Sequence, residues 1–390
     1  MYELGTKKST IRTIFEFGRK RAAEVGEENI FDFSLGNPNV PTPDFVRDAA
    51  IEILQTYEPA QVHGYTVAPG NPNVREALAE SLNKRFNTHF AGKNLFVTSG
   101  AAAAITICFK ALCEDNDEFI AFAPFFPEYR CFVEAVGGKL VVVPARTADF
   151  QIDFAALEAN IGPRTKAVIV NSPNNPSGVV FRQETLAELG ALLTRKATEF
   201  GHPIYLIADE PYRELTYDGA ETVYLPLVYP DTVICYSYSK SLSMPGERIG
   251  YVCVPDRVTD SQALFAAIAG AARATGHVCA PSLMQHVIAR STRLRPDMEA
   301  YDRNRQLLYK ELTDMGFACV KPTGAFYMLV KAPDGDSLSF SDRAKELNLL
   351  IVPTDDFGCP GFVRLSTCVG HDMILRSLPA FRTLAASYGL

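Results

Sequence analysis

The sequence predicts an α/β protein with three layers, in which helices cover both faces of a mainly parallel sheet. Short apolar runs such as Lys166–Val170, Pro203–Ala208 and Thr232–Cys235 have the length and composition of buried strands. These runs alternate with helical patterns, and that alternation is typical of a parallel sheet. Polar residues follow the strands directly, at the place where ligands bind in open α/β sheets.

Length and pattern together predict two domains. A chain of 390 residues is long for one compact core. The alternating pattern predicts a large ligand-binding domain over residues 45–280. Residues 281–390 contain helices and two later strand-like runs, Gly324–Val330 and Gly361–Ser366. We expect them to form a smaller α/β domain together with residues 1–44.

Charge and composition exclude several classes of protein. A formal net charge of −7 leaves no basic surplus for binding nucleic acid. The polar stretch Met1–Thr10 predicts no secretory signal, and the most apolar stretch, Ala263–Ala272, is too short to span a bilayer and predicts a buried helix. Nine cysteines without a C-x-x-C pair predict reduced thiols, no metal site and a cytoplasmic location.

The first third of the chain alternates between helical patterns and loops. Ser9–Val25 predicts an amphipathic helix, and Phe31–Leu35 alternates like a strand before the proline-rich loop Gly36–Pro43. The turn-rich loop His63–Gly70, which carries Tyr65, precedes another helix. In isolation Tyr65 is an ordinary surface tyrosine. The apolar residues of that following helix are Val74, Leu78, Leu82 and Phe86.

Two strand ends here carry candidate binding groups. The strand Asn94–Thr98 is followed by a helix that opens with Gly100, Ala101 and Ala102. Small residues let the free backbone N–H groups at a helix start approach an anion, although alanine is also the best helix former. The strand Glu118–Phe122 leads to Phe126, and an aromatic residue in this place is most often part of the core.

Two further strand ends carry an amide and an acid. The strand Lys166–Val170 ends in an N-x-P-x-N-P-S-G run whose two prolines fix a turn and point Asn175 inward. Without its surroundings this would be a plain Asn-Pro turn. The strand Pro203–Ala208 delivers Asp209, and Tyr212 follows; the alternative role of Asp209 is a helix N-cap.

The segment from Tyr236 to Tyr251 holds the densest cluster of reactive groups. After a buried strand, it places the hydroxyls of Ser237 and Ser239, the amine of Lys240 and the guanidinium of Arg248 within twelve residues. Ser and Arg suit a phosphate, and a partly desolvated lysine can act as a nucleophile. A lone Ser-x-Ser-Lys would be a solvated loop, but the Pro-Gly-x-Arg-x-Gly continuation favours a site.

Ser-x-Ser-Lys followed by Pro-Gly-x-Arg-x-Gly-Tyr resembles the cofactor-lysine segment of class I aminotransferases, the fold-type-I pyridoxal phosphate (PLP) enzymes. The likeness extends from about Phe31 to Arg364 and is closest to the aspartate and aromatic aminotransferases. It implies the aspartate aminotransferase-like fold, with residues 45–280 as the PLP-binding domain.

The resemblance implies how PLP is held. Lys240 would form the Schiff base, and the phosphate would be bound by Ser237, Ser239, Arg248 and the backbone at 100–102. Asp209 would keep the pyridine nitrogen protonated, so that the ring accepts electrons from the substrate. The resemblance also implies three contacts to the ring and its phenolate oxygen, made by Phe126, Asn175 and Tyr212.

The resemblance also implies the partners. The substrates would be an amino acid and a 2-oxo acid, bound by Gly36, Asn175 and Arg364. Arg364 would clamp the α-carboxylate, with a structural ion pair as the alternative. Tyr65 would reach the cofactor phosphate of the other subunit in a homodimer. Family members specific for aspartate can carry a lysine where Ala102 stands, so the amino acid stays open among aspartate, alanine and aromatic ones.

These features predict transfer of an amino group by a ping-pong mechanism. Lys240, Asp209 and Tyr212 would be the catalytic residues, and Lys240 would move the proton from the substrate's Cα to the cofactor. Two alternatives share the fold: a PLP-dependent carbon–sulfur β-lyase, and a non-catalytic PLP-sensing module of a transcription regulator. A regulator of that kind would carry a DNA-binding domain before the PLP domain. Here only about thirty residues precede Gly36, and the whole chain is acidic.

Overall fold

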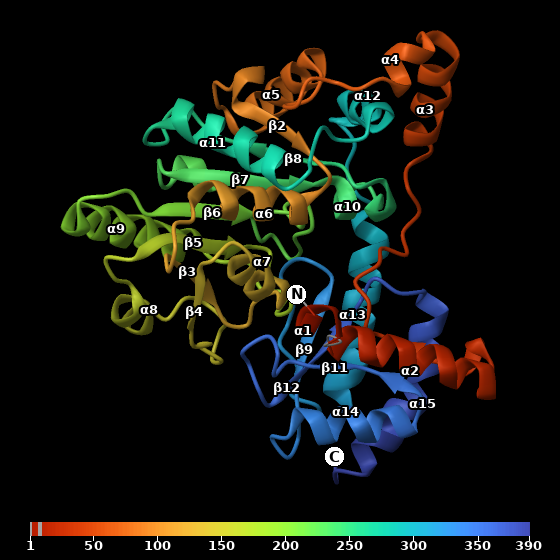
Figure 1. Ribbon diagram of the computed structural model, residues 1–390. Helices are drawn as coiled ribbons and strands as arrows, with labels where there is room; N and C mark the ends of the chain where they lie inside the picture. The colour runs from red at the N-terminus through yellow and green to blue at the C-terminus, as the bar shows by residue number, and fades with distance from the viewer. Residues whose placement is uncertain (1, 7–9) are drawn as a thin grey trace.

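The computed structural model describes residues 2–6 and 10–390 and has the predicted α/β class (Figure 1). Its largest sheet has seven strands in the order β2-β8-β7-β6-β5-β3-β4. Neighbouring strands are parallel except that β8 is antiparallel to both β2 and β7. The strands are β2 (Leu95–Thr98), β3 (Glu118–Phe122), β4 (Lys139–Val143), β5 (Thr165–Asn171), β6 (Tyr205–Asp209), β7 (Thr232–Ser237) and β8 (Gly250–Cys253).

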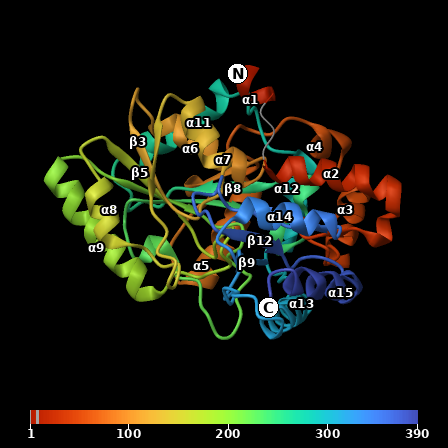
Figure 2. The same ribbon diagram turned by 90° about the horizontal axis from the view of Figure 1, so that it is seen from below.

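Helices cover both faces of this sheet because side chains alternate along each strand. In β5, Ala167 and Ile169 lie in one apolar core, whereas Val168 and Val170 lie in another. The first core contains residues of α6 (Ala101–Leu112), α7 (Glu128–Ala135) and α11 (Ser261–Ala274). Figure 2 shows α6 and α11 on one side of the strands and α5 on the other. The helices in the second core are α3 (Asp44–Thr56), α4 (Pro59–His63), α5 (Pro72–Phe86), α8 (Phe154–Asn160), α9 (Gln183–Phe200) and α12 (Ser282–Ser291).

A second, smaller group of elements packs around its own core. Three antiparallel strands have the order β11-β12-β9, and β1 pairs with β10 in parallel. Figure 1 shows the N-terminal helix α2 lying beside these C-terminal elements. The elements are α2 (Thr10–Val25), β1 (Phe31–Asp32), α13 (Met298–Asp314), β9 (Tyr327–Lys331), α14 (Ser337–Glu346), β10 (Leu349–Leu350), β11 (Val352–Pro353), β12 (Phe362–Ser366) and α15 (His371–Ala386). The short helix α1 (Tyr2–Thr6) precedes them in the chain.

The domain boundaries at 44/45 and 280/281 stay a prediction. Residues of α12, which follows the second boundary, are buried in the core of the large sheet with α3 and α5. Short helical turns complete the described chain: α10 (Tyr238–Ser241) and the 3-10 turns Glu27–Asn29, Gly92–Asn94, Leu225–Leu227 and Pro245–Glu247.

The longer predicted elements are present in the structure. Helix α2 covers the predicted helix from Thr10 on, while the predicted first residue, Ser9, lies outside the described residues. The alanine-rich stretch predicted as a buried helix belongs to α11, whose inward residues include Leu264 and Ile268. In the described part of the chain no helix is long and apolar enough to cross a membrane.

Two predicted strands are shorter than expected. The run Phe31–Leu35 forms only the two residues of β1, because Ser34 turns back to donate from its N–H and hydroxyl to the Asp32 carboxylate. The run Gly324–Val330 is a strand only from Tyr327. Before it Ala325 has a left-handed φ of 55° and donates its N–H to Leu215, so the backbone cannot extend there.

Candidate active site

The predicted binding residues meet because their strands end at one edge of the sheet. β2, β3, β5, β6 and β7 run in the same direction, and the antiparallel β8 begins at that same edge. A cavity of about 270 Å³ lies there. It is lined by Ile11, Gly36, Ala101, Ala102, Ile105, Phe126, Phe132, Asn171, Asn175, Asp209, Pro211, Tyr212, Ser237, Ser239, Lys240, Pro245, Arg248, Tyr327 and Arg364.

A larger groove elsewhere on the molecule holds none of the predicted site residues. It has a volume of about 1030 Å³ and is lined by parts of the segments 179–187 and 219–228. We place the active site in the smaller cavity because the reactive groups converge only there within the described chain.

Lys240 lies at the end of β7 on the short turn α10. The hydroxyl of Ser237 caps this turn by accepting from the N–H of Ser239. The Lys240 Nζ donates to the carbonyl of Gly36 over 2.6 Å and lies 5.4 Å from the ring centre of Phe326. Burial lowers the pKa of the Lys240 ammonium to about 8, so the neutral, nucleophilic amine is accessible near neutral pH.

One end of the cavity is built for an anion. The hydroxyls of Ser237 and Ser239 lie 2.6 Å apart, and the guanidinium of Arg248 donates to the carbonyls of Ser99 and Pro245. Gly100 has a φ of 86° and immediately precedes α6. A Cβ at position 100 would lie 2.8 Å from Arg248 Nη2, so glycine is needed for this close approach. Serine hydroxyls, an arginine and free helix N–H groups together suit a phosphate.

Asp209 ends β6 at the centre of the cavity with half of its carboxylate unsatisfied. Oδ2 accepts from the hydroxyl of Tyr129 and, over 3.4 Å, from the amide of Asn171. Oδ1 is buried and has no hydrogen-bond partner in the structure. Burial raises the pKa of Asp209 to about 7, although the Tyr129 hydrogen bond opposes this shift. A cationic ligand group at Oδ1 would stabilise the charged form.

The helix-cap alternative for Asp209 is wrong, because a turn and no helix follows β6. Glu210, the next residue, is buried on the opposite side of the sheet, where it pairs with Arg213. The alternation of a strand therefore separates two adjacent acids into two environments.

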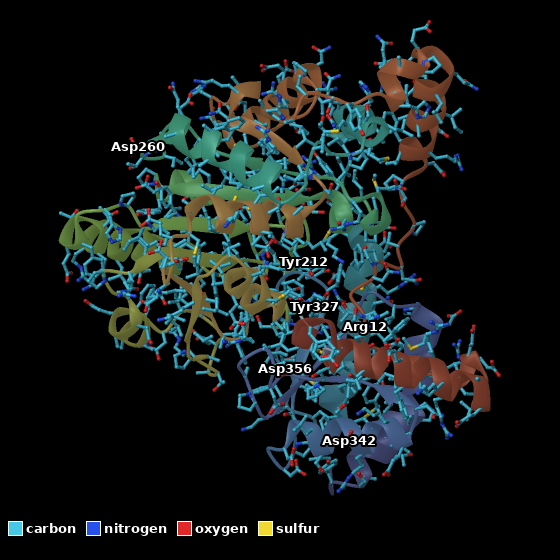
Figure 3. The ribbon with its side chains drawn as sticks, in the orientation of Figure 1. Arg12, Tyr212, Asp260, Tyr327, Asp342 and Asp356 are labelled. Atoms are coloured by element: carbon cyan, nitrogen blue, oxygen red, sulfur yellow. The ribbon has the colours of Figure 1, made fainter. Side chains whose placement is uncertain are left out.

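Three polar side chains complete the wall opposite the anion-binding end. The hydroxyls of Tyr212 and Tyr327, both labelled in Figure 3, lie 3.3 Å apart. The Tyr327 hydroxyl lies directly against Gly36. A Cβ added at position 36 would be only 1.7 Å from the Tyr327 hydroxyl oxygen. The side-chain oxygen of Asn175 accepts from Arg364 over 3.1 Å, which leaves the Asn175 amide available as a donor to a ligand.

Arg364 is a buried cation without an acid. It lies in β12 and is 2 % exposed. Its guanidinium donates to the side-chain oxygen of Asn175 and to the backbone carbonyl of Ser34, and it lies 4.5 Å over the ring of Tyr327. Its Nε has no partner. Among the described residues no carboxylate pairs with it, so the structural ion pair weighed as an alternative is wrong there.

Tyr65 lies apart from all of these groups. It is 90 % exposed and does not line the cavity of its own chain. Its loop is held by Gln285, which donates to the hydroxyl of the neighbouring Thr66 over 3.1 Å. The exposed ring is free to contact a second molecule, as the resemblance implies for a second subunit.

The sequence analysis missed several residues of the site. Tyr129 and Asn171, which hold the Asp209 carboxylate, belong to runs that follow β3 and end β5, and this position was an available signal. Tyr327 lies far along the chain and gave no local signal. Over the ranges that the structure describes, no group of His, Cys, Asp and Glu side chains could hold a metal ion.

Comparisons with known proteins agree with this geometry. A family model described as "Aminotransferase class I and II" matches residues 28–378. The chain is 31 % identical to the aspartate/prephenate aminotransferase of Thermus thermophilus, over 89 % of each chain. It is 28 % identical to aromatic-amino-acid aminotransferase 2 of Thermococcus litoralis, covering 94 % of this chain and 92 % of that one.

Solved structures extend the comparison. An amino transferase from Eubacterium rectale superposes with a TM-score of 0.98 at 53 % identity, covering 100 % of this chain and 98 % of the other. The aspartate aminotransferase of Thermus thermophilus superposes with a TM-score of 0.84 at 29 % identity, covering 98 % of both chains.

Proposed function

Because this chain belongs to the class I and II aminotransferase family and is a PLP-dependent transaminase, we propose that the cavity around Lys240 is its active site. The single observation that carries the proposal is the meeting, in one cavity, of three charged groups that have no oppositely charged partner among the described residues. These are the amine of Lys240, the carboxylate of Asp209 and the guanidinium of Arg364.

The residues present fit PLP. The orphaned Asp209 Oδ1 suits a protonated ring nitrogen, and the cradle at Gly100 suits a phosphate. Ser237, Ser239, Arg248 and the N–H groups at Ala101 and Ala102 would hold that phosphate. Phe126 would cover a ring face, and Asn175 and Tyr212 would donate to the phenolate oxygen. When bound, the cofactor supplies an electron sink for the substrate's Cα.

Lys240 moves the proton in this proposal. With its pKa near 8, Nζ can accept the proton from the substrate's Cα and later return it. The Gly36 carbonyl, 2.6 Å from Nζ, holds the amine beside the substrate position. Asp209 is buried away from water, and Tyr129 and Asn171 hold its carboxylate in place. The negative charge of the carboxylate would therefore face the ring nitrogen of the cofactor.

Arg364 binds the α-carboxylate of the amino acid and of the 2-oxo acid. Its Nε lacks a partner, and its other contacts are to neutral oxygens. A carboxylate can pair with such a fork through two hydrogen bonds. Gly36 and Asn175 flank this position. Neither the family nor the relatives give support to the carbon–sulfur β-lyase or to the non-catalytic sensing module.

The test is to find which lysine binds the cofactor. Reduction of the PLP-loaded protein with borohydride, followed by peptide mapping, is expected to put the pyridoxyl label on Lys240 alone. Lys240→Ala is expected to lose both the label and the absorbance of the lysine-bound cofactor, whereas Lys196→Ala on α9 keeps both. A label on another lysine would sink the assignment.

We further propose a homodimer in which Tyr65 serves the partner's site. A 90 % exposed tyrosine and the exposed Phe45, Ile51, Leu54 and Val67 nearby in the sequence support an apolar contact. Mixing inactive Lys240→Ala and Tyr65→Ala chains under subunit exchange is expected to give heterodimers with one intact site. If both variants are individually dead, exchange is confirmed and the mixture stays dead, both residues act within one subunit.

Two further expectations remain proposals. We expect the large PLP-binding domain to span 45–280 and the small one to combine 1–44 with 281–390; limited proteolysis would locate the connections. We also expect a cytoplasmic location, which is supported by nine cysteines that are all unpaired. Cell fractionation tests it.

A further inference from the structure

Tyr327 lines the cavity but has no part in the proposed function. Its phenol is buried and contacts groups from three separate segments of the chain. The ring centre lies 4.5 Å from the guanidinium of Arg364, and the hydroxyl lies 3.3 Å from that of Tyr212 (Figure 3). The same hydroxyl lies directly against Gly36. The phenol therefore stands between the group that would bind the α-carboxylate and a group that would bind the cofactor's phenolate oxygen.

The small sheet places this ring beside Arg364. Tyr327 begins β9 and pairs with Ser366 of β12, while Arg364, two residues before Ser366, projects from the same face of that strand. Tyr327 and Arg364 are thus diagonal neighbours on one face, a separation that an aromatic ring can span. A cation over a tyrosine ring is attracted to it, most strongly where both are shielded from water. The ring therefore restricts where the guanidinium can lie.

Backbone hydrogen bonds hold the two tyrosines together, although they are 115 positions apart in the chain. The N–H of Leu215 donates to the carbonyl of Tyr212 over 2.8 Å, and the N–H of Ala325 donates to the carbonyl of Leu215 over 2.9 Å. Ala325 lies two residues before Tyr327. Both hydroxyls are therefore carried by fixed backbone, and the glycine at position 36 leaves the space that the Tyr327 hydroxyl occupies.

The direction of the hydrogen bond between the two phenols follows from the role of Tyr212. Burial raises the pKa of both phenols, so each keeps its proton near neutral pH. A hydroxyl has one proton to donate. Because Tyr212 gives its proton to the phenolate oxygen in the proposed function, its own oxygen accepts from Tyr327. A hydroxyl that accepts a hydrogen bond is polarised and becomes a stronger donor. Tyr327 thus strengthens the contact between Tyr212 and the cofactor.

We propose that Tyr327 is a positioning residue with two separable parts. Its ring aligns the Arg364 guanidinium for the α-carboxylate, and its hydroxyl supports Tyr212 as the donor to the phenolate oxygen. The inference rests on the proposed function of Arg364 and Tyr212, and it adds a residue that acts through both of them.

A pH titration of the cofactor-loaded protein tests the hydroxyl. The absorbance of the lysine-bound cofactor reports the pKa of its link to Lys240. A weaker donor at the phenolate oxygen raises that pKa, because the anion is less stabilised. Tyr327→Phe, which keeps the ring, is expected to raise it by roughly 0.2–0.6 pH unit.

Tyr301→Phe is the matched control for the lost hydroxyl. Tyr301 belongs to the same apolar cluster as Tyr327, but its hydroxyl lies 3.4 Å from that of Ser243 and it does not line the cavity. The pKa of the cofactor link should not change in this variant. A shift equal to that of Tyr327→Phe would overturn the role of the Tyr327 hydroxyl.

Tyr212→Phe separates this inference from the proposed function. It should raise the same pKa by more, roughly 1–2 pH units, and Tyr327→Phe should add nothing in the double variant. Arg248, Arg364 and Cys368 also act on the Lys240 amine, but they are the same in every variant. An unchanged pKa in Tyr327→Phe, or an equal shift with and without Tyr212, overturns the role of the hydroxyl. An unchanged pKa in Tyr212→Phe would mean that the proposed function of Tyr212 itself fails, and this role with it.

Tyr327→Leu tests the ring. The half-reaction is followed at increasing concentrations of the fastest donor among L-aspartate, L-alanine and L-phenylalanine. The apparent affinity should fall about 3- to 10-fold in Tyr327→Leu, as for a lost cation–ring contact, and change less than twofold in Tyr327→Phe. Thermal unfolding checks that each variant is folded. Wild-type affinity in a folded Tyr327→Leu, or an equal loss in both variants, overturns the role of the ring.

Discussion

Two arginines are the largest fully buried charged side chains among the described residues, and their surroundings differ in one respect. Arg305 on α13 and Arg364 on β12 are each 2 % exposed, and each guanidinium lies over a tyrosine ring, at 4.7 Å and 4.5 Å. Arg305 pairs with the carboxylates of Asp218 and Asp302. Arg364 contacts only neutral oxygens and keeps one unpaired nitrogen.

The adjacent acids Asp209 and Glu210 repeat this contrast. Both are buried and each keeps one carboxylate oxygen without a hydrogen bond, but Glu210 is paired with the Arg213 guanidinium, whereas Asp209 has only neutral donors. A buried charge without an opposite charge nearby destabilises the fold. We therefore expect such a charge where a ligand supplies the missing opposite charge. We call Asp209, Lys240 and Arg364 the open charges, and the Arg305 and Arg213 ion pairs the closed charges. The difference teaches that a buried charge by itself does not mark the site; the lack of an opposite charge beside it among the described residues does.

The largest effect is expected from the open acid. Asp209→Asn should retain PLP but slow the half-reaction by about 10³-fold or more, because an amide cannot stabilise the positive ring nitrogen. Single-turnover absorbance measurements check this. Glu210→Gln is the matched control on the closed side, and it should lower stability without slowing the reaction per folded site. Half-reaction rates near those of the wild type in Asp209→Asn would contradict the role given to the Asp209 carboxylate.

Arg364→Ala comes next. The variant loses a charged hydrogen bond to the substrate's α-carboxylate, and such a bond contributes roughly 1.5–3 kcal/mol. The apparent affinity for the amino acid should therefore fall about 10- to 100-fold. The absorbance of the lysine-bound cofactor should be unchanged. Substrate titration of the half-reaction is the measurement. Loss of cofactor or of fold would instead indicate a structural role, and unaltered kinetics would exclude both roles.

Arg305→Met sharpens the comparison from the closed side. It removes the partner of Asp218 and Asp302, whose side chains are 36 % and 32 % exposed and can regain water. The stability cost should therefore be roughly 1–2 kcal/mol, below that of a wholly buried pair. Urea unfolding measures it, with KM for the amino acid unchanged. A raised KM together with normal stability would show that Arg305 also serves the substrate.

The last prediction concerns the pH dependence of stability and the open amine of Lys240. The folded, cofactor-free chain lowers the pKa of Lys240 to about 8, so the unfolded chain binds this proton more tightly. Lys240 thus costs stability below pH 8, and the cost disappears as pH rises from 8 toward the ordinary lysine pKa. Cofactor-free Lys240→Met should be more stable than wild type by about 1–3 kcal/mol at pH 7, with the gap closing by about pH 10. Lys93→Met, which changes an exposed lysine, is the control. A pH-independent gap would contradict the assignment.

Much of the site could be predicted because its residues lie next to strands. Gly100, Phe126, Asn175, Asp209 and Lys240 each follow a recognisable apolar run, and the parallel sheet collects such ends at one edge. The roles proposed for them came from the resemblance of the Lys240 segment to a known family. The edge strand β4 and the short strands β10 and β11 were not predicted, although Leu140–Val143 and Leu349–Val352 are continuous apolar runs.

Residues whose importance depends on a distant partner could not be found this way. Tyr327 matters because it meets Tyr212, 115 positions earlier in the chain, and Arg364. Tyr129 matters because its hydroxyl reaches Asp209. Ile11 looked like one apolar position of an amphipathic helix, and only the packing of α2 against Phe357 brings it to the cavity. No local pattern records such contacts.

The sequence by itself determined the α/β class and led to the proposed binding edge of the sheet and to Lys240 as the proposed centre of the chemistry, because periodicity and strand-end motifs are local properties. Only the tertiary structure decided which buried charges are closed and which stay open. Arg305 follows Arg303 and Asn304 on a helix and Arg364 lies between Val363 and Leu365 on a strand, but neither local context states whether a carboxylate pairs with the guanidinium. What separates them is whether the folded chain brings a carboxylate within reach, and that depends on segments far apart in sequence that meet only when the chain folds.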